Sequence, residues 1–87
     1  MDIGQAITAV KDGKLIARSG WNGKGMFVYY VPPASYPANR GAMTSHFGEG
    51  AMVPYNAYLA LCGPDGKVST WSPSCSDALA TDWYVLG

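Results

Sequence analysis

The segment RSGWNGKGMFVYYVP, residues 18–32, joins a glycine-rich turn to the most strand-like stretch of the chain. Its second half, residues 25–32, is rich in β-branched and aromatic residues and ends at two prolines, which predicts a β-strand. Because apolar residues run along it almost without interruption, we expect both faces to be covered, by the core and by a neighbour or ligand. In the first half, the glycines around Trp21 either shape a tight connection or let backbone and an indole ring approach a ligand.

The residues before this segment predict a short amphipathic helix, because four apolar residues recur at helical spacing: Ile3, Ala6, Ile7 and Val10. Asp2 and Gln5 have the spacing of a capping box. Gly13 follows the apolar stripe, where a left-handed C-terminal residue is expected. Residues 14–21 then predict a short strand.

The residues after the segment break the pattern. Proline, glycine and alanine recur through residues 32–54, which predicts a long excursion without regular structure. An excursion of this length in a small chain is either an interaction arm or a loop without a role. It contains Arg40 and His46, and we therefore expect it to be a place where a phosphate could be held.

The C-terminal third predicts a hairpin over residues 55–71, because GPDG at residues 63–66 has the residues of a tight turn. Residues 72–82 predict a loop and one helical turn that starts near Ser76, and residues 83–87 predict an edge strand. The fold class is therefore α+β, with an N-terminal amphipathic helix packed on a small antiparallel sheet in one domain of residues 1–87.

The composition predicts self-association. Of the 87 residues, 48% are hydrophobic and 13% aromatic. A chain of this length buries only a modest share of its surface, so one small core cannot readily hide so many large apolar side chains. Symmetric contacts between copies would bury the surplus, and we expect a homo-oligomer.

Charge and cysteine content exclude several classes of protein. Six basic and six acidic residues are scattered singly, without the basic stripe of a protein that binds polymeric nucleic acid. Cys62 and Cys75, without a signal peptide, favour a reduced cytoplasm over a disulfide framework. His46 is the one histidine, so no metal site is expected, and we predict no cofactor. The longest apolar run is too short to span a membrane.

The sequence gives little support for catalysis. No signature surrounds His46, and the spacing of Asp77 and Asp82 is more typical of a helix cap and a solvated acid. GWNGKG, residues 20–25, lacks the spacing of a phosphate-binding P-loop. We therefore expect a binding protein and not an enzyme.

The residues needed for a nucleotide-like ligand are present. Trp21 and Trp71 can stack on a nucleobase. Arg40 and glycine N–H groups can meet a phosphate. Four polar side chains can read base edges or ribose hydroxyls: Asn22, Ser74, Ser76 and Asp77.

Two long stretches carry a resemblance to a known family. ITAVKDGKLIARSGWNGKGMFVYYVP, residues 7–32, and DGKVSTWSPSCSDALATDW, residues 65–83, together resemble the second Thoeris anti-defence family of phage proteins. The resemblance implies a sponge for immune signals that assembles as a homotetramer, with ligand held between protomers. The implied ligand is a cyclic ADP-ribose isomer (glycocyclic ADP-ribose) that TIR-domain enzymes make from NAD. The implied location is the cytoplasm of the infected bacterial host.

The resemblance also implies which residues form the site. The first motif of the family is matched by Trp21, Asn22, Gly23 and Met26, and the C-terminal signature by Trp71, Ser74, Asp77 and Trp83. Cys75 and Ser76 stand where relatives commonly carry Gln and Thr, which leaves a hydrogen bond from that Gln open in this chain. We expect Trp83 in the core, and Asp77 either caps the last helical turn or contacts the ligand.

Three alternatives stay open. The main ligand could be a cyclic dinucleotide of CBASS immunity, in a second pocket to which Arg40 and residues 32–54 contribute. The chain could be an enzyme that cleaves the nucleotide. It could also be a structural or protein-interaction module, in which the aromatic surplus is purely interfacial.

Overall fold

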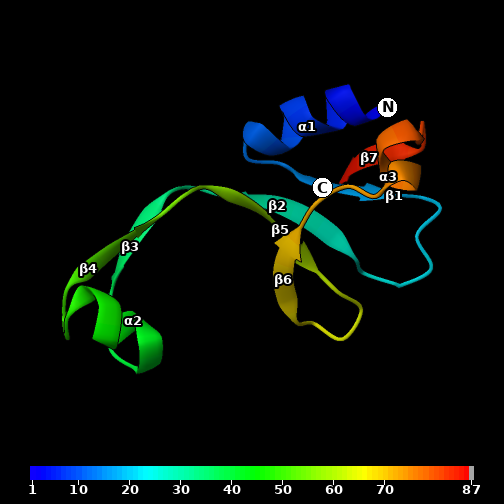
Figure 1. The fold of residues 1–87 in the computed structure, drawn as a ribbon. Helices are drawn as coiled ribbons and strands as arrows, with labels where there is room; N and C mark the ends of the chain where they lie inside the picture. The colour runs from blue at the N-terminus through cyan, green and yellow to red at the C-terminus, as the bar shows by residue number, and fades with distance from the viewer. Residues whose placement is uncertain (87) are drawn as a thin grey trace.

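The computed structural model describes residues 1–86 and places an antiparallel sheet of five strands under one helix (Figure 1). The strand order is β6-β5-β2-β1-β7. A second, two-stranded sheet pairs β3 with β4. The helices and strands, in chain order, are α1 (Ile3–Lys11), β1 (Leu15–Arg18), β2 (Phe27–Val31), β3 (Ala34–Pro37), α2 (Gly41–Phe47), β4 (Met52–Tyr55), β5 (Tyr58–Cys62), β6 (Val68–Trp71), α3 (Cys75–Leu79) and β7 (Trp83–Leu86).

The predicted N-terminal helix is confirmed, together with its capping box. The Asp2 carboxylate accepts from the Gln5 N–H at 2.8 Å, and the Gln5 side chain accepts from the Asp2 N–H at 3.0 Å. These bonds satisfy N–H groups that the first turn of a helix leaves without partners. Gly13, with φ of 93°, lies where the chain leaves α1 and turns into β1.

The core lies between α1 and one face of the five-stranded sheet. Its buried residues come from α1, from the central strand β2, from the neighbouring strand β1, and from β7: Ala6, Val10, Ile16, Val28 and Trp83. The register places Val28 opposite Ile16 on one side and opposite Leu61 on the other. The strand predicted at residues 25–32 is thus the centre of the sheet, and its apolar side chains supply the core.

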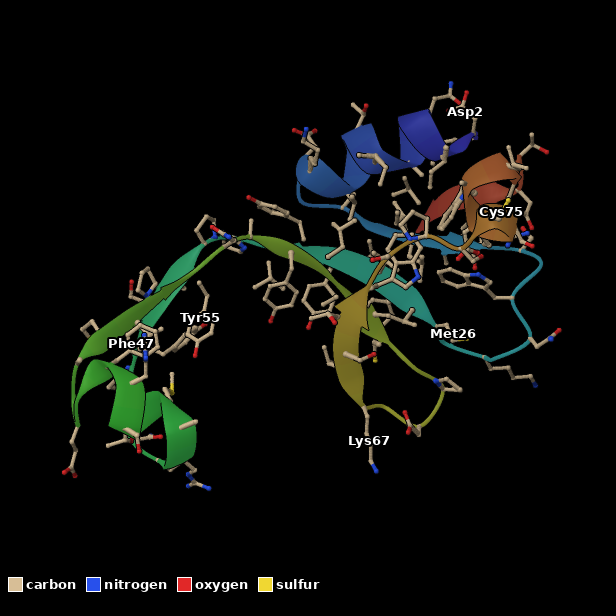
Figure 2. All side chains as sticks on the ribbon, in the orientation of Figure 1. Asp2, Met26, Phe47, Tyr55, Lys67 and Cys75 are labelled. Carbon is tan, nitrogen blue, oxygen red and sulfur yellow. The ribbon has the colours of Figure 1, made fainter. Side chains whose placement is uncertain are left out.

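The opposite face of the sheet is apolar, and no other part of residues 1–86 packs over it in Figure 2. Side chains alternate along a strand, so residues one position from the core residues point to this face. They include Leu15, Phe27, Tyr29, Tyr58 and Val68, of which Tyr58 and Val68 are exposed by 43% and 53%. Within one chain, therefore, only one of the two faces of β2 is covered.

The prediction that residues 32–54 lack regular structure is wrong. β3 and β4 form an antiparallel ribbon that runs from the pair Ala34 and Tyr55 to the pair Pro37 and Met52, and α2 closes its end. Because β3 follows β2 and β4 precedes β5, the ribbon extends away from the sheet as an arm, defined as residues 32–57 (Figure 1). Proline and glycine hid it from a sequence analysis, since both are rare in strands.

Backbone hydrogen bonds hold the end of the arm. The Ala38 N–H donates to the Ala51 carbonyl at 2.8 Å, and the Gly50 N–H donates to the Ala38 carbonyl at 2.8 Å. Ala38 is fully buried between them, whereas α2 has no buried side chain. The radius of gyration is 15.9 Å, against about 12 Å for a compact domain of this length. The arm makes the chain elongated.

The elements predicted for the C-terminal third are present, with small shifts in their boundaries. The turn at residues 63–66 is confirmed, with the Gly63 N–H donating to the Lys67 carbonyl at 2.9 Å and Gly66 at φ of 80°. The first strand of this hairpin begins at Tyr58 instead of Tyr55, because Tyr55 pairs within the arm. The short helix is confirmed as α3, and the C-terminal edge strand is confirmed as β7 over Trp83–Leu86, while Gly87 lies outside the described residues. Over residues 1–86, no helix has the length and apolar character needed to cross a bilayer.

Candidate functional site

The three tryptophans meet at one end of the sheet. Trp21 comes from the connection between β1 and β2, Trp71 from the end of β6, and Trp83 from the start of β7. Their ring centroids lie 5.4 to 6.5 Å apart, and each pair of rings is close to perpendicular, with angles of 72° to 81°. Such edge-to-face pairs stabilise a cluster by about 0.5–1.5 kcal/mol each beyond the area that they bury.

The three rings are buried to different depths. Trp83 is 2% exposed and belongs to the core, as the sequence predicted. Trp21 and Trp71 are half-buried and pack against that core. The indole N–H of Trp83 donates to the main-chain carbonyl of Asp77 at 3.0 Å, which ties α3 to the cluster. Trp21 and Trp71 therefore keep part of their surface open beside a fixed third ring.

Asp77 receives most of the polar contacts at this end. Its Oδ1 accepts from Arg18 Nη1 at 2.8 Å and from the indole N–H of Trp21 at 3.1 Å. Its Oδ2 accepts from the Ser74 N–H at 3.1 Å, and its own N–H donates to Ser74 Oγ at 3.1 Å, which completes a second capping box. Asp77 is 8% exposed. Its carboxylate is thus engaged with three protein groups.

Arg18 joins two carboxylates. Its Nε donates to Asp82 Oδ1 at 2.8 Å, while its Nη1 pairs with Asp77. Asp82 Oδ2 also accepts from the Gly20 N–H at 2.7 Å, so the start of the β1–β2 connection is tied to the residue that directly precedes β7. The Arg18 side chain is 17% exposed. In the sequence, Arg18 is one of several scattered charges, and no local pattern indicates this role.

The pKa values of these groups reflect the network. Burial acts to raise the pKa of Asp77, but hydrogen bonds from Arg18, Trp21 and Ser74 outweigh it and lower the pKa below its ordinary value. The hydrogen bond from Arg18 is the main cause that lowers the pKa of Asp82. Hydrogen bonds to Asp82 and then Asp77 raise the pKa of Arg18. All three groups are therefore charged near neutral pH.

The glycine-rich connection packs against the β5–β6 turn. A Cβ atom at Gly23 would meet the side chain of Met26 and would lie 3.0 Å from Pro64 Cγ. A Cβ atom at Gly20 would lie 2.8 Å from Asp82 Oδ2. These two glycines let the connection approach its neighbours in the protein, which is the first of the two roles that the sequence left open.

The predicted site residues do not all come together. Trp21, Trp71, Ser74 and Asp77 form one cluster, with Gly23 and Met26 in the adjoining connection. The side chains of Asn22 and Ser76 are exposed. Arg40 lies directly before α2, which is at the opposite end of the molecule from α3 (Figure 1). Within one chain, Arg40 and the tryptophans cannot contact the same small ligand.

Two hollows lie elsewhere on the sheet. One, of about 420 Å³, is on the uncovered face and is lined mainly by Leu15, Phe27, Tyr29, Cys62 and Val68. The other, of about 220 Å³, lies between α1 and the start of β5. Both are apolar and open, as expected of surfaces that pack against another protein surface. In residues 1–86, no group of three or more His, Cys, Asp or Glu side chains is placed to hold a metal ion.

Fold and site together define a small α+β domain that presents two half-buried indole rings beside a glycine-rich connection, with an ion-pair network behind them. The chain belongs to the Tad2-like family, described as the Thoeris anti-defense 2-like domain, whose model matches residues 1–86. It is also 33% identical over 87 residues to Thoeris anti-defense 2 of Bacillus phage SP01, which covers 99% of this chain and 94% of that protein. The resemblance found in residues 7–32 and 65–83 is therefore confirmed, and membership of this family supports an anti-defence role.

Proposed function

We propose that this protein is a sponge that binds and sequesters glycocyclic ADP-ribose without cleaving it. The ligand is a cyclic ADP-ribose isomer made by TIR-domain enzymes in the cytoplasm of the infected bacterial host. Sequestration would keep the Thoeris effector inactive. The observation that carries the proposal is the pair of half-buried rings of Trp21 and Trp71, fixed beside the glycine-rich connection in a member of an anti-defence family.

The chemistry of this end of the sheet suits a nucleotide. Aromatic faces stack on a base of any identity, with about 1–3 kcal/mol per stacked base. The exposed side chains of Asn22, Ser74 and Ser76 lie on the connection and at the start of α3, where they can bond ribose hydroxyls or base edges. Ring orientations set by the protein before binding reduce the entropy that binding costs.

A sponge must hold its ligand tightly, because it competes with a receptor. Nanomolar affinity corresponds to about −12 kcal/mol, which a small ligand reaches in a pocket that encloses most of its surface. Within one chain, Trp21 and Trp71 stay half-exposed at one end of the sheet. We therefore propose that the pocket is completed by a second copy, in a homotetramer.

The surface of the chain supports self-association. It exposes 5805 Å², whereas a compact monomer of this length exposes about 4,900 Å². The excess, roughly 900 Å², is close to the ~800 Å² that each partner buries in an interface of standard size. A second copy is thus sufficient to account for the extra surface.

Two surfaces are suited to this contact. The strand residues on the uncovered sheet face include no charged side chain and several aromatic ones, which is typical of the centre of an interface. The arm exposes further large apolar side chains: Tyr36, Phe47, Met52 and Tyr55. Figure 2 places Phe47 and Tyr55 together along the arm.

Sequestration fits the site better than cleavage does. The carboxylates of Asp77 and Asp82 already accept hydrogen bonds from Arg18, and their lowered pKa values make them poor general acids near neutral pH. His46 lies in α2 on the arm, away from both carboxylates.

Ligand retention followed by release tests the proposal. The purified protein is mixed with glycocyclic ADP-ribose, freed of unbound ligand and heat-denatured, and the supernatant is analysed by chromatography. We expect intact nucleotide from the wild type and from Leu79→Ala, a control at a 78% exposed position of α3. We expect none from Trp21→Ala, whose oligomeric state is checked by size-exclusion chromatography.

The other outcomes separate the alternatives. A cleaved product would show that the protein is an enzyme. If nothing is retained, the same procedure is repeated with cyclic dinucleotides, whose retention would make the protein a sponge for the second class of signal. Loss of assembly in Trp21→Ala, without retention of either ligand by the wild type, would indicate an interaction module.

A further inference from the structure

Asp77 connects α3 to Arg18 and to two of the three tryptophans, Trp21 and Trp83. Its side chain bonds Arg18, Trp21 and the Ser74 N–H, and its main-chain carbonyl accepts from the indole N–H of Trp83. A carboxylate with these partners and 8% exposure has little capacity left for a ligand. Its position nevertheless decides how the ring beside it is oriented.

Trp21 is half-buried, and its ring has a single hydrogen-bond donor, the indole N–H. This group donates to Asp77 Oδ1 at 3.1 Å. Two edge-to-face contacts, with Trp71 and Trp83, support the ring from its sides. Edge contacts leave a half-buried indole some freedom to rotate, and a hydrogen bond at one corner of the ring restricts that rotation.

We propose that Asp77 is a positioning residue, which holds the plane of Trp21 for stacking on the ligand and does not itself contact the ligand. This inference rests on the proposed function. It has a consequence for recognition: because the indole N–H is used within the protein, Trp21 contributes a stacking face and no hydrogen bond to the ligand.

Asp82 supplies the matched control. Both carboxylates bond Arg18 at 2.8 Å and both have a backbone N–H partner, but Trp21 donates its indole N–H to Asp77. In Asp77→Asn, the charge that pairs with Arg18 is lost. In either orientation of the new amide, its NH₂ group faces an N–H donor of the protein and cannot accept a hydrogen bond from it. Asp82→Asn causes the same kind of loss without touching the ring.

The test measures the affinity for glycocyclic ADP-ribose by calorimetry in the wild type and both variants. We expect Asp77→Asn to weaken binding on the order of tenfold, which corresponds to a loss of about 1.4 kcal/mol in binding free energy. We expect Asp82→Asn to weaken binding clearly less. The same pair is measured in a Trp21→Phe background, where the ring has no N–H. There the effect of Asp77→Asn should largely disappear, since the two residues act as a unit.

A second measurement keeps the inference testable if a variant is poorly folded. In the NMR spectrum of Asp77→Asn, the indole N–H signal of Trp21 should shift and exchange faster with solvent. The indole N–H signal of Trp83 should keep its chemical shift and its exchange rate, because its acceptor is the main-chain carbonyl of residue 77. In the wild type, saturating ligand should leave the Trp21 N–H protected from exchange.

The outcomes distinguish this inference from the proposed function. If the wild type binds no nucleotide, the proposed function is wrong. If the wild type binds but both variants weaken binding equally, Asp77 acts only on stability and the inference is wrong. Full persistence of the Asp77→Asn effect in the Trp21→Phe background would also overturn it, since Asp77 would then contact the ligand directly.

Discussion

The two ends of this molecule are built in different ways. At the tryptophan end, every tryptophan ring packs on a neighbouring ring. Arg18 donates hydrogen bonds of 2.8 Å to Asp77 and to Asp82, and Trp21 donates to Asp77 at 3.1 Å. At the arm end, no residue of α2 is fully buried, and the hydroxyl oxygen of the half-buried Thr44 is shielded from solvent without a hydrogen-bond partner among residues 1–86. The first end is ordered by its own contacts, as a preformed binding site requires. The second presents apolar surface that suits a contact with another protein surface.

Truncation of a ring at each end should give the largest contrast. Trp83→Ala removes a core side chain and should lower the free energy of unfolding by about 3–5 kcal/mol. Phe47→Ala, at a position 50% exposed on the arm, removes no core side chain of its own chain and should lower it clearly less. Urea denaturation measures both. Similar losses in the two variants would contradict the contrast between the ends.

Gly23 tests how tightly the glycine-rich connection is packed. Gly23→Ala places a methyl group against Met26 and Pro64, and such overpacking should cost about 1–3 kcal/mol of unfolding free energy. Combining it with Met26→Ala should recover part of this loss, because one of the two obstructing side chains becomes smaller. An unchanged stability of Gly23→Ala would show that the connection adapts and is not preformed.

Acid should destabilise the protein through Asp77 and Asp82 at the tryptophan end. The pKa values of Asp77 and Asp82 are lowered in the folded protein, so their contribution to stability is present above the unfolded value of about 3.9 and is lost as the pH falls below it. We expect the thermal midpoint to fall as the pH is lowered through 4 towards the folded pKa values. In Asp77→Asn the fall should be smaller, and an identical pH dependence would exclude Asp77 as a cause.

The cap of α3 should have a moderate effect. Ser74 Oγ accepts from the Asp77 N–H, and Ser74→Ala should lower the free energy of unfolding by about 1 kcal/mol, as loss of an N-cap usually does. Ser76→Ala, at an exposed position of the same helix, should change it by less than about 0.5 kcal/mol. Thermal denaturation of the pair checks this order, and equal effects would show that the capping box adds nothing.

Shortening the arm should have the smallest effect on the sheet. Residues 38–51 are replaced by Asn-Gly, a dipeptide suited to join two paired strands directly. Because α2 buries no side chain, the sheet should keep its circular dichroism spectrum and change its unfolding free energy by less than about 1 kcal/mol. Light scattering should report a smaller assembly than in the wild type. An unfolded sheet would show instead that the arm is required by the core.

The sequence predicted the fold class and most elements, because each depends on near neighbours in the chain. Helical spacing and a capping box predicted α1, GPDG predicted the β5–β6 turn, and β-branched and aromatic residues predicted β2. The arm was missed for a local reason as well. Its strands contain Pro37 and Pro54, which a sequence analysis counts against a strand but which an edge position tolerates.

Part of the candidate site could also be predicted. The sequence predicted a binding surface around Trp21 and Trp71, because both are aromatic and lie beside glycine and serine. The structure brings the two rings together. The sequence could not show that Arg40 lies at the far end of the molecule, because its distance from the tryptophans depends on the direction in which the arm leaves the sheet. The resemblance in residues 7–32 and 65–83 indicated the family, which the family model confirms.

The sequence by itself thus determined the local elements outside the arm, the surplus of apolar surface and the family. Only the tertiary structure decided which charges meet, since Arg18 lies 59 and 64 positions before Asp77 and Asp82. That contact exists because β1 and β7 are neighbours in the sheet and place Arg18 opposite Trp83. Strand order is set by how the whole chain buries its core, and no short stretch of sequence contains that information.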